Sequence, residues 1–533
     1  MLARILTVGG WTLVSRITGF MRDIMLAAIL GAGPVADAFF VAFRLPNHFR
    51  AIFAEGAFNA AFVPAYARVY GQGGAQSAGL FADRIFTLLF GVEVVLVALA
   101  MAFSPTVVSL LAPGFADDAL RFPLASELTR ITFPYLLLVS LVTLYGGILN
   151  TLQRFASPAA APVLLNLAMM LTLALVVFFP TAGHAAAWGV LLSGVLQVLL
   201  VGGDAWRQGL LPGFAAFRLD DDVRRFFKAL GPATLGSAGS QIALFADTII
   251  ASFLSAGALS ALYYADRLNQ LPIGVIGIAV GTVLLPDMAS RLARGDEAGA
   301  SHAQNRAIEF TLLLSIPCLA AFVVVPDLVM RALFARGAFT EADAAAAGAT
   351  LAAYAVGLLP FVLLRSVSST FLARGDTATP VKALFASIVV NVALKVLLMD
   401  RYAQVGLAFA TSVGVWINFG LLAWFAHRAR LLAPDARLKA SLWKLAVAGL
   451  ALAAVLCAGT RWLVPLFSGW VRLGDVAALA ALALAGAFVY FGAILVLFGR
   501  GFLRALAASA RGGRNSPGKE AGSPAENAPE ERY

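Results

Sequence analysis

SRITGFMRDIMLAAILGAGPVADAFFVAFRLPNHFRAIFAEGAFNAAFVP, residues 15–64, is the stretch that decides the fold of this chain. It is apolar enough to lie in a lipid bilayer. A charged side chain at the middle of a membrane helix costs about 2.5–3.5 kcal/mol, so four arginines facing lipid would cost on the order of 10 kcal/mol. We therefore expect the charges of this stretch to face a polar cavity inside a helix bundle. They are Arg16, Arg22, Asp23, Asp37, Arg44, Arg50 and Glu55.

The spacing of these charges supports a cavity wall. Arg16 and Asp23 are seven residues apart, as are Asp37 and Arg44, which places each pair within about 20° on one helix face. Arg22 lies roughly 120° from Arg16, so charge covers a broad sector of the first helix. The alternative is that the charges neutralise one another between helices as buried ion pairs.

The composition places the chain in a membrane. Of its 533 residues 60% are hydrophobic and 13% are charged, with a mean hydropathy of +0.86, whereas about a quarter of the residues of soluble domains are charged. The positive-inside rule accounts for the net charge of +10, so no nucleic-acid partner is expected. The cysteines and histidines lack metal-ligand spacing, and we expect no metal site.

The sequence contains no convincing catalytic motif. Gly513, Gly518 and Lys519 match the start of a phosphate-binding loop, but Glu520 stands where Ser or Thr would bind magnesium. No nucleophile arrangement of the Ser/His/Asp or Cys/His kind is recognisable. We therefore predict a transporter and not an enzyme, without a cofactor.

The apolar segments predict an all-α polytopic membrane protein. Division at Gly, Pro and charge clusters gives about fourteen segments long enough to cross a bilayer. Most Lys and Arg residues fall on one side when the amino terminus is cytoplasmic, which makes both termini cytoplasmic. We expect a six-helix lobe at 1–220, a second at 221–430, two extra helices at 431–500 and a disordered polar tail at 501–533.

An internal repeat relates the two lobes. FVAFRL at 40–45 matches YYADRL at 263–268, and Ser-Pro at 157–158 matches Thr-Pro at 379–380, both at an offset of about 222 residues. Because the offset spans an even number of expected helices, the repeat is parallel, with its axis along the membrane normal. Two such lobes across a basic cleft, to which the second contributes Arg267, are typical of a rocking, alternating-access carrier.

Four of these segments carry a resemblance to a known family. They are SRITGFMRD (15–23), DAFFVAFRLPN (37–47), FAEGAFNAAFVP (53–64) and YYADRLNQLPIGVIGIAVGTVLLP (263–286). From residue 1 to about 500 the chain resembles the MurJ (MviN) family of bacterial lipid II flippases, within the multidrug/oligosaccharidyl-lipid/polysaccharide exporter superfamily.

The resemblance implies a substrate and a set of site residues. The substrate is lipid II, undecaprenyl diphosphate carrying the peptidoglycan disaccharide-pentapeptide, moved to the periplasmic leaflet of the inner membrane. Membrane lipids and cell-wall synthesis proteins are further partners, a membrane potential or ion gradient drives transport, and the extra helices at 431–500 form a groove for the lipid tail. The substrate-binding residues are Arg16, Arg22, Arg50, Arg267 and Arg44, and the supporting or gating residues are Asp23, Asp37 and Glu55. Asp266 is added to the supporting residues because it adjoins Arg267 and could orient an arginine of the other lobe.

One departure from the family concerns cations. Members of the superfamily can hold sodium at a carboxylate site in the second lobe. Here Lys395 lies four residues after Asn391 on one helix face, and its ammonium would fill such a site by pairing with Asp247. We expect no second-lobe sodium site, although the alternative that Asp247 and Lys395 never meet remains open.

Other functions make different demands on the cavity. A flippase for another polyprenyl-diphosphate-linked oligosaccharide would share the basic cavity, a drug/cation antiporter would need an acidic one, and a non-transporting scaffold would not need intramembrane arginines. Arg365 is a further intramembrane charge, with either a structural or a functional role.

Overall fold

The chain folds into helices. The computed structural model describes residues 2–52, 57–216, 218–467, 469 and 473–499, and within these ranges it contains no strand. Glu55 and the predicted disordered tail at 501–533 lie outside the described residues.

The helices of the first part of the chain extend to Arg207. They are α1 (Leu2–Leu30), α2 (Pro34–Ile52), α3 (Phe58–Ala102), α4 (Ser104–Leu111), η2 (Pro113–Phe115), α5 (Arg121–Thr132), α6 (Pro134–Thr151), α7 (Ala156–Ala174), η3 (Val176–Phe178) and α8 (Ala182–Arg207).

The helices of the second part begin after the loop that follows Arg207. They are α9 (Asp221–Ser252), α10 (Ala258–Pro272), the π-helical turn η4 (Ile273–Gly277), α11 (Ile278–Ala293), α12 (Glu297–Val324), α13 (Pro326–Phe334), α14 (Glu341–Ala355), α15 (Leu358–Leu372), α16 (Ala378–Arg428), α17 (Ala436–Trp462), η5 (Val464–Phe467) and α18 (Gly474–Phe498).

The all-α membrane class predicted from the sequence is confirmed. Among the described residues, ten helical segments are long and apolar enough to cross a membrane. Two of them contain a non-helical residue, Gly74 in α3 and Ala403 in α16, so each joins two helices at a kink. The expected total of about fourteen spans stays a prediction. Pro46 and Pro64 lie inside α2 and α3.

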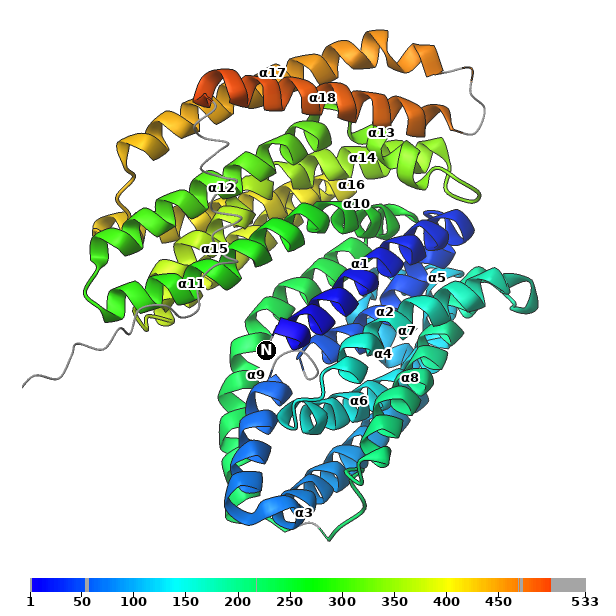
Figure 1. The fold of residues 1–533 in the computed structure, drawn as a ribbon. Helices are drawn as coiled ribbons and strands as arrows, with labels where there is room; N and C mark the ends of the chain where they lie inside the picture. Colours follow the sequence, from blue (N-terminus) through cyan, green and yellow to red (C-terminus); the bar gives the residue numbers. More distant parts are fainter. Residues whose placement is uncertain (1, 53–56, 217, 468, 470–472, 500–533) are drawn as a thin grey trace, which may run out of the picture.

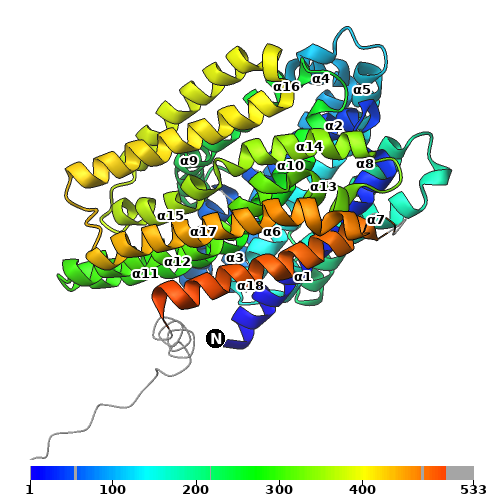
Figure 2. The same cartoon turned by 90° about the horizontal axis from the view of Figure 1, so that it is seen from above.

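The helices gather into two groups. Figure 1 shows α1–α8 together on one side and α10–α18 on the other, and α17 and α18 lie at the outer edge of the second group. Helix α17 packs against α12 and α18, which Figure 2 shows running side by side with it. Helix α9 contacts both α3 of the first group and α16 of the second. The boundary drawn between lobes at residue 220 therefore stays a prediction.

Residues predicted to be equivalent in the repeat touch one another where the two groups meet. Phe40 of α2 and Tyr263 of α10 stack with ring centroids 3.9 Å apart. At the same spacing along the chain, Asp37 is equivalent to Ser260, and the Ser260 hydroxyl donates a hydrogen bond to the Asp37 carboxylate. Only residues near a two-fold axis can contact their own equivalents, so the predicted repeat would have its pseudo-two-fold axis between α2 and α10.

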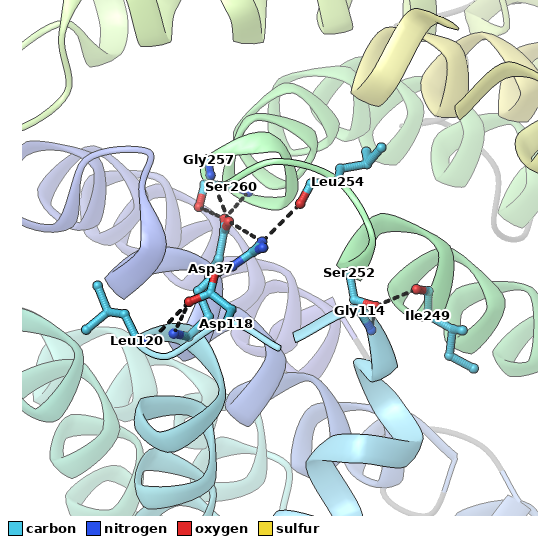
Figure 3. A network of polar contacts seen from close by, with 10 residues as sticks. Asp37, Gly114, Asp118, Leu120, Ile249, Ser252, Leu254, Gly257 and Ser260 are labelled. Carbon is cyan, nitrogen blue, oxygen red and sulfur yellow. Dashed lines mark hydrogen bonds and ion pairs between the residues drawn. The ribbon is translucent and has the colours of Figure 1, made fainter. Parts of the chain in front are cut away.

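A polar network closes one end of this interface (Figure 3). Asp37 accepts hydrogen bonds from the backbone N–H groups of Gly257 (2.8 Å) and Ser260 (2.9 Å) at the start of α10. Arg121 of α5 donates to the Leu254 carbonyl at 3.0 Å and lies 3.9 Å from the Asp37 carboxylate. We call these five residues the latch, because they join α2 and α5 of the first group to the α9–α10 connection.

Asp118 holds Arg121 in position within the latch. Its carboxylate accepts hydrogen bonds from the Arg121 backbone N–H at 2.8 Å and from the Arg121 Nε at 2.6 Å. These hydrogen bonds lower the pKa of the Asp118 carboxyl below its ordinary value, so the group is ionised at neutral pH. The Arg121 guanidinium also lies 4.4 Å from the centre of the Phe115 ring, which fixes its position further.

The expectation that Asp37 faces the same cavity as the arginines is wrong. Its side chain is fully buried in the latch and does not line the cavity described below. The shared helix face of Asp37 and Arg44 was derived from angle alone. Seven residues also advance about 10 Å along the helix axis, which separates the latch from the cavity.

Candidate substrate cavity

A basic cavity of about 680 Å³ lies between the two groups of helices. Its walls come from α1, α2 and α7 on one side and from α9, α10, α15 and α16 on the other. Six arginines and three aspartates line it, which gives a net charge of +3 from these side chains. They are Arg16, Arg22, Arg44, Arg50, Arg267, Arg365, Asp23, Asp247 and Asp266.

Asp23 joins the arginines of the two groups. Its Oδ1 lies 2.7 Å from Nη2 of Arg22 on the same helix, and Asn166 of α7 accepts a hydrogen bond from the Arg22 Nη1 at 3.1 Å. From α10, the Tyr263 hydroxyl donates to Asp23 at 3.3 Å, and the Arg267 Nε lies 3.9 Å from the other carboxylate oxygen. One carboxylate therefore partly neutralises two arginines and links α1 to α10.

Arg267 is fixed by a ring as well as by a carboxylate. Its guanidinium carbon lies 4.7 Å from the centre of the Tyr263 ring, a cation–π contact. Since Tyr263 stacks on Phe40, Arg267 is positioned by residues of both groups. The hydroxyl contact of Tyr263 with Asp23 could not be predicted from the sequence, because it depends on how the two groups of helices meet.

Two further arginines extend from α2. Arg44 donates to the Thr248 hydroxyl of α9 at 2.7 Å, and Arg50 donates to the Asn47 side chain at 3.2 Å. Arg44 thus reaches across to the second part of the chain, whereas the contact with Asn47 lies within α2.

The second part contributes the carboxylates of Asp247 and Asp266. The Lys395 ammonium of α16 forms an ion pair with Asp247 of α9, and its side chain is only 2% exposed. The structure therefore brings together the two residues whose meeting the sequence left open. Asp266 accepts a hydrogen bond from Gln270 one turn later on α10.

The structure thus gathers most of the proposed site residues in one place. All five predicted arginines line the cavity, as do Asp23, Asp247 and Asp266. Their roles in binding stay predictions. Sequence reasoning missed Asn166, whose signal was an isolated amide in an apolar helix, and left the role of Arg365 open.

The chemistry of this cavity suits an anion. Arginine presents a planar fork of donors that matches phosphate and carboxylate oxygens, and the lining carries an excess of positive charge. Among the described residues, no group of three or more His, Cys, Asp or Glu side chains is placed to hold a metal ion. A basic cavity between two groups of membrane helices, latched at one end, defines a multi-pass membrane carrier.

Comparisons with known proteins identify the family. The family model described as lipid II flippase MurJ matches residues 26–472. A probable lipid II flippase MurJ of Rhizobium meliloti (strain 1021) is 40% identical over 520 residues, which cover 94% of this chain and 96% of that protein. The lipid II flippase MurJ of Burkholderia cenocepacia is 35% identical, over 80% of this chain and 83% of its own length. The chain belongs to the MurJ family of lipid II flippases, which confirms the resemblance seen in the sequence.

Solved structures share the fold. The lipid II flippase MurJ in an inward closed conformation matches with a TM-score of 0.77 and 24% identity, over 94% of this chain and 99% of that one. An inward-facing multidrug resistance MATE transporter of the MOP superfamily matches with a TM-score of 0.67 and 16% identity, over 80% and 95% of the two chains. At these identities the likeness concerns the fold alone.

Proposed function

We propose that this chain moves lipid II from the cytoplasmic to the periplasmic leaflet of the bacterial inner membrane by alternating access. The observation that carries the proposal is the cavity with a net charge of +3, built from both groups of helices. The diphosphate of lipid II is a compact anion, and several arginine forks can hold it at once. Membership of the MurJ family supports lipid II as the particular cargo.

The order of steps in the proposed cycle follows from the positive charge of the cavity and the negative charge of the diphosphate. With both termini in the cytoplasm, α1 runs outward, so the latch closes the periplasmic end of the cavity. A diphosphate entering from the cytoplasm offsets positive charge that otherwise holds the two groups apart, and their approach favours release of the latch. The head group then leaves on the periplasmic side.

The lipid tail stays in the bilayer throughout the proposed cycle. Helices α17 and α18 lie outside the repeat and pack on α12 and α13. We assign them the groove along which the tail slides, because an apolar tail needs no polar path while the head group crosses.

The chain needs no cofactor in this scheme. A membrane potential or an ion gradient resets the carrier, and one charge crossing 100 mV is worth about 2.3 kcal/mol.

Growth rescue tests the proposed cargo. Cells depleted of their own lipid II flippase are expected to grow when they express this chain, because the cavity accepts the same diphosphate-linked head group. The measurement is colony formation, with membrane levels checked by immunoblot and accumulated lipid II measured in parallel. If the inserted chain fails to rescue these cells but restores export in cells lacking a polysaccharide-unit flippase, the cargo is another polyprenyl-diphosphate-linked oligosaccharide.

A drug/cation antiporter is the weaker alternative. Such a carrier needs carboxylates that are free to bind a cation. Here Asp23 is engaged by Arg22 and Asp247 by Lys395. The excess of arginine in the cavity lining also repels cations.

The Lys395–Asp247 pair leads to a prediction about sodium. We expect Lys395→Ala to acquire sodium binding, because the change leaves the Asp247 carboxylate without its ammonium partner. One turn before Lys395 on α16, the buried Oδ1 of Asn391 accepts no hydrogen bond from the described residues. The measurement is thermal unfolding of the purified protein in equal concentrations of sodium or potassium chloride. Sodium at about 100 times its Kd stabilises a protein by about 2.7 kcal/mol.

The controls for sodium binding are the parent chain and the double variant Lys395→Ala/Asp247→Asn. Neither should respond to sodium, because one retains the ammonium and the other lacks the carboxylate. A Lys395→Ala protein that is no more sensitive to sodium than its parent contradicts the idea that the ammonium occupies a cation site.

A further inference from the structure

The arginines of the cavity fall into two kinds. Four of them contact side chains of the chain itself, including Arg22 and Arg267 at Asp23 and Arg44 at Thr248. The other two differ. Among the described residues, the guanidiniums of Arg16 and Arg365 have neither a hydrogen bond nor an ion pair, although both side chains line the cavity and are exposed. Their charge is therefore available to a ligand without the loss of an existing contact.

The two unpaired arginines lie against the same helical face. A Cβ atom on Gly274 would lie 2.5 Å from the Nη1 of Arg16. Similarly, Cβ atoms on Gly277 and Gly281 would lie 3.8 Å and 4.0 Å from side-chain carbons of Arg365. These glycines recur at helical spacing along η4 and α11, so they present one face. The absence of side chains there leaves room for both arginines.

Arg16 and Arg365 come from opposite groups of helices. Arg16 belongs to α1 in the first group, and Arg365 belongs to α15 in the second. A ligand that bound both would bridge the two groups of helices. A single carboxylate or monophosphate offers one anionic centre, whereas a diphosphate offers two phosphoryl groups that two forks can hold separately.

We propose that Arg365 is a substrate-binding residue and that it forms, with Arg16, the pair that grips the two phosphoryl groups of the substrate diphosphate. This inference rests on the proposed function and names the part of the cavity that recognises the diphosphate. Arg22 and Arg267, held at Asp23, shape the cavity and contribute to its potential. Arg16 and Arg365 select a diphosphate over a monophosphate.

The test compares two lipids that differ only in that group. Undecaprenyl diphosphate and undecaprenyl monophosphate are titrated into the purified full chain in mixed micelles, and binding is measured by native mass spectrometry. The parent chain is expected to prefer the diphosphate. Arg365→Gln and Arg16→Gln are each expected to reduce that preference about ten- to a hundred-fold, the range for loss of a charge-assisted hydrogen bond.

Two further variants sharpen the comparison. Arg294→Gln removes an exposed arginine at the end of α11 that does not line the cavity, and it should keep the parental preference. Arg365→Lys keeps the charge but not the fork, so it should lose part of the preference. It also serves as the test if Arg365→Gln is not recovered as a monodisperse protein.

The outcomes separate the two proposals. If both Arg365 variants keep the parental preference for the diphosphate, the assignment of Arg365 is overturned, while growth rescue by the parent chain leaves the proposed function standing. If the parent chain binds both lipids equally, the proposal that Arg16 and Arg365 together recognise the diphosphate is overturned as well. If the parent chain binds neither lipid and does not rescue depleted cells, it is the proposed function that fails.

Discussion

Arg267→Ala is expected to abolish growth rescue in depleted cells while the protein still reaches the membrane at its normal level. The change removes a guanidinium that α10 contributes to the cavity, but Asp23 keeps Arg22 as its ion-pair partner at 2.7 Å. Because Asp23 is not left without a cation, the fold should survive. Arg22→Ala and Arg50→Ala are expected to lose rescue as well, because each removes a cavity charge. The measurement is colony formation, normalised to the membrane level of each variant.

Asp23→Ala provides the matched contrast to Arg267→Ala. It removes the carboxylate that Arg22 and Arg267 share, and Arg22 is buried. Loss of one partner of a buried ion pair typically destabilises a protein by about 3–5 kcal/mol. We therefore expect Asp23→Ala to fail in rescue through a reduced level and a lower Tm, which fluorescence-detected size exclusion after heating would measure.

Arg294→Gln serves as the control for both variants, since this exposed side chain does not line the cavity. Rescue by Arg267→Ala at the parental level would show that transport does not require this arginine. The proposal that α10 contributes a charge needed for transport would then be wrong. A normal Tm for Asp23→Ala would contradict its assignment as the link between α1 and α10.

Asp37→Ala is expected to open the latched end of the interface. The Asp37 carboxylate accepts three hydrogen bonds from Gly257 and Ser260, and hydrogen bonds to charged groups contribute about 1.5–3 kcal/mol each. Their loss also leaves the buried Ser260 N–H and the half-buried Gly257 N–H without the partner they have now. The free-energy advantage of the closed arrangement should therefore fall by several kcal/mol relative to an arrangement in which the two groups of helices have separated at this end.

Cysteine labelling measures this opening. In a chain whose two native cysteines are replaced, Ala258→Cys places a thiol at the start of α10, at a position that is only 3% exposed. A membrane-impermeant maleimide added from the periplasmic side should label it slowly in the parent background. In the Asp37→Ala background, labelling should be at least about tenfold faster, since 1.4 kcal/mol already changes an equilibrium tenfold.

Asp117→Ala is the control for the latch. Asp117 is an exposed aspartate next to Asp118, and its loss should leave the labelling rate unchanged. Equal rates in the Asp37→Ala and Asp117→Ala proteins would mean that the latch does not hold this end closed.

The sequence predicted the fold class and the cavity arginines for one physical reason. A charge facing lipid is so unfavourable that its position in an apolar stretch already indicates a polar interior. The predicted repeat could also be recognised in the sequence, because FVAFRL and YYADRL share an aromatic residue and an arginine at matching positions.

The level of a side chain along the membrane normal and the residue with which it interacts could not be predicted in this way. Periodicity gives the angle of a side chain around a helix but not the level at which a neighbouring helix meets it, so Asp37 was assigned to the cavity and lies in the latch. Two features depend on packing between helices that are far apart in the sequence. One is the pairing of Asp247 with Lys395, and the other is that the guanidinium of Arg365 has no hydrogen bond or ion pair within the part of the chain that the structure describes.

The contact between Asp37 and Ser260 also bears on how the chain originated. In a dimer of identical half-length chains, a residue on the two-fold axis would meet its own copy. Two aspartates there would place like charges together in a fully buried site, where they cannot both stay ionised. One carboxylate facing one hydroxyl requires two positions that mutate independently. The predicted repeat implies such a pair of positions, because duplication and fusion of one gene would let residues 37 and 260 change separately.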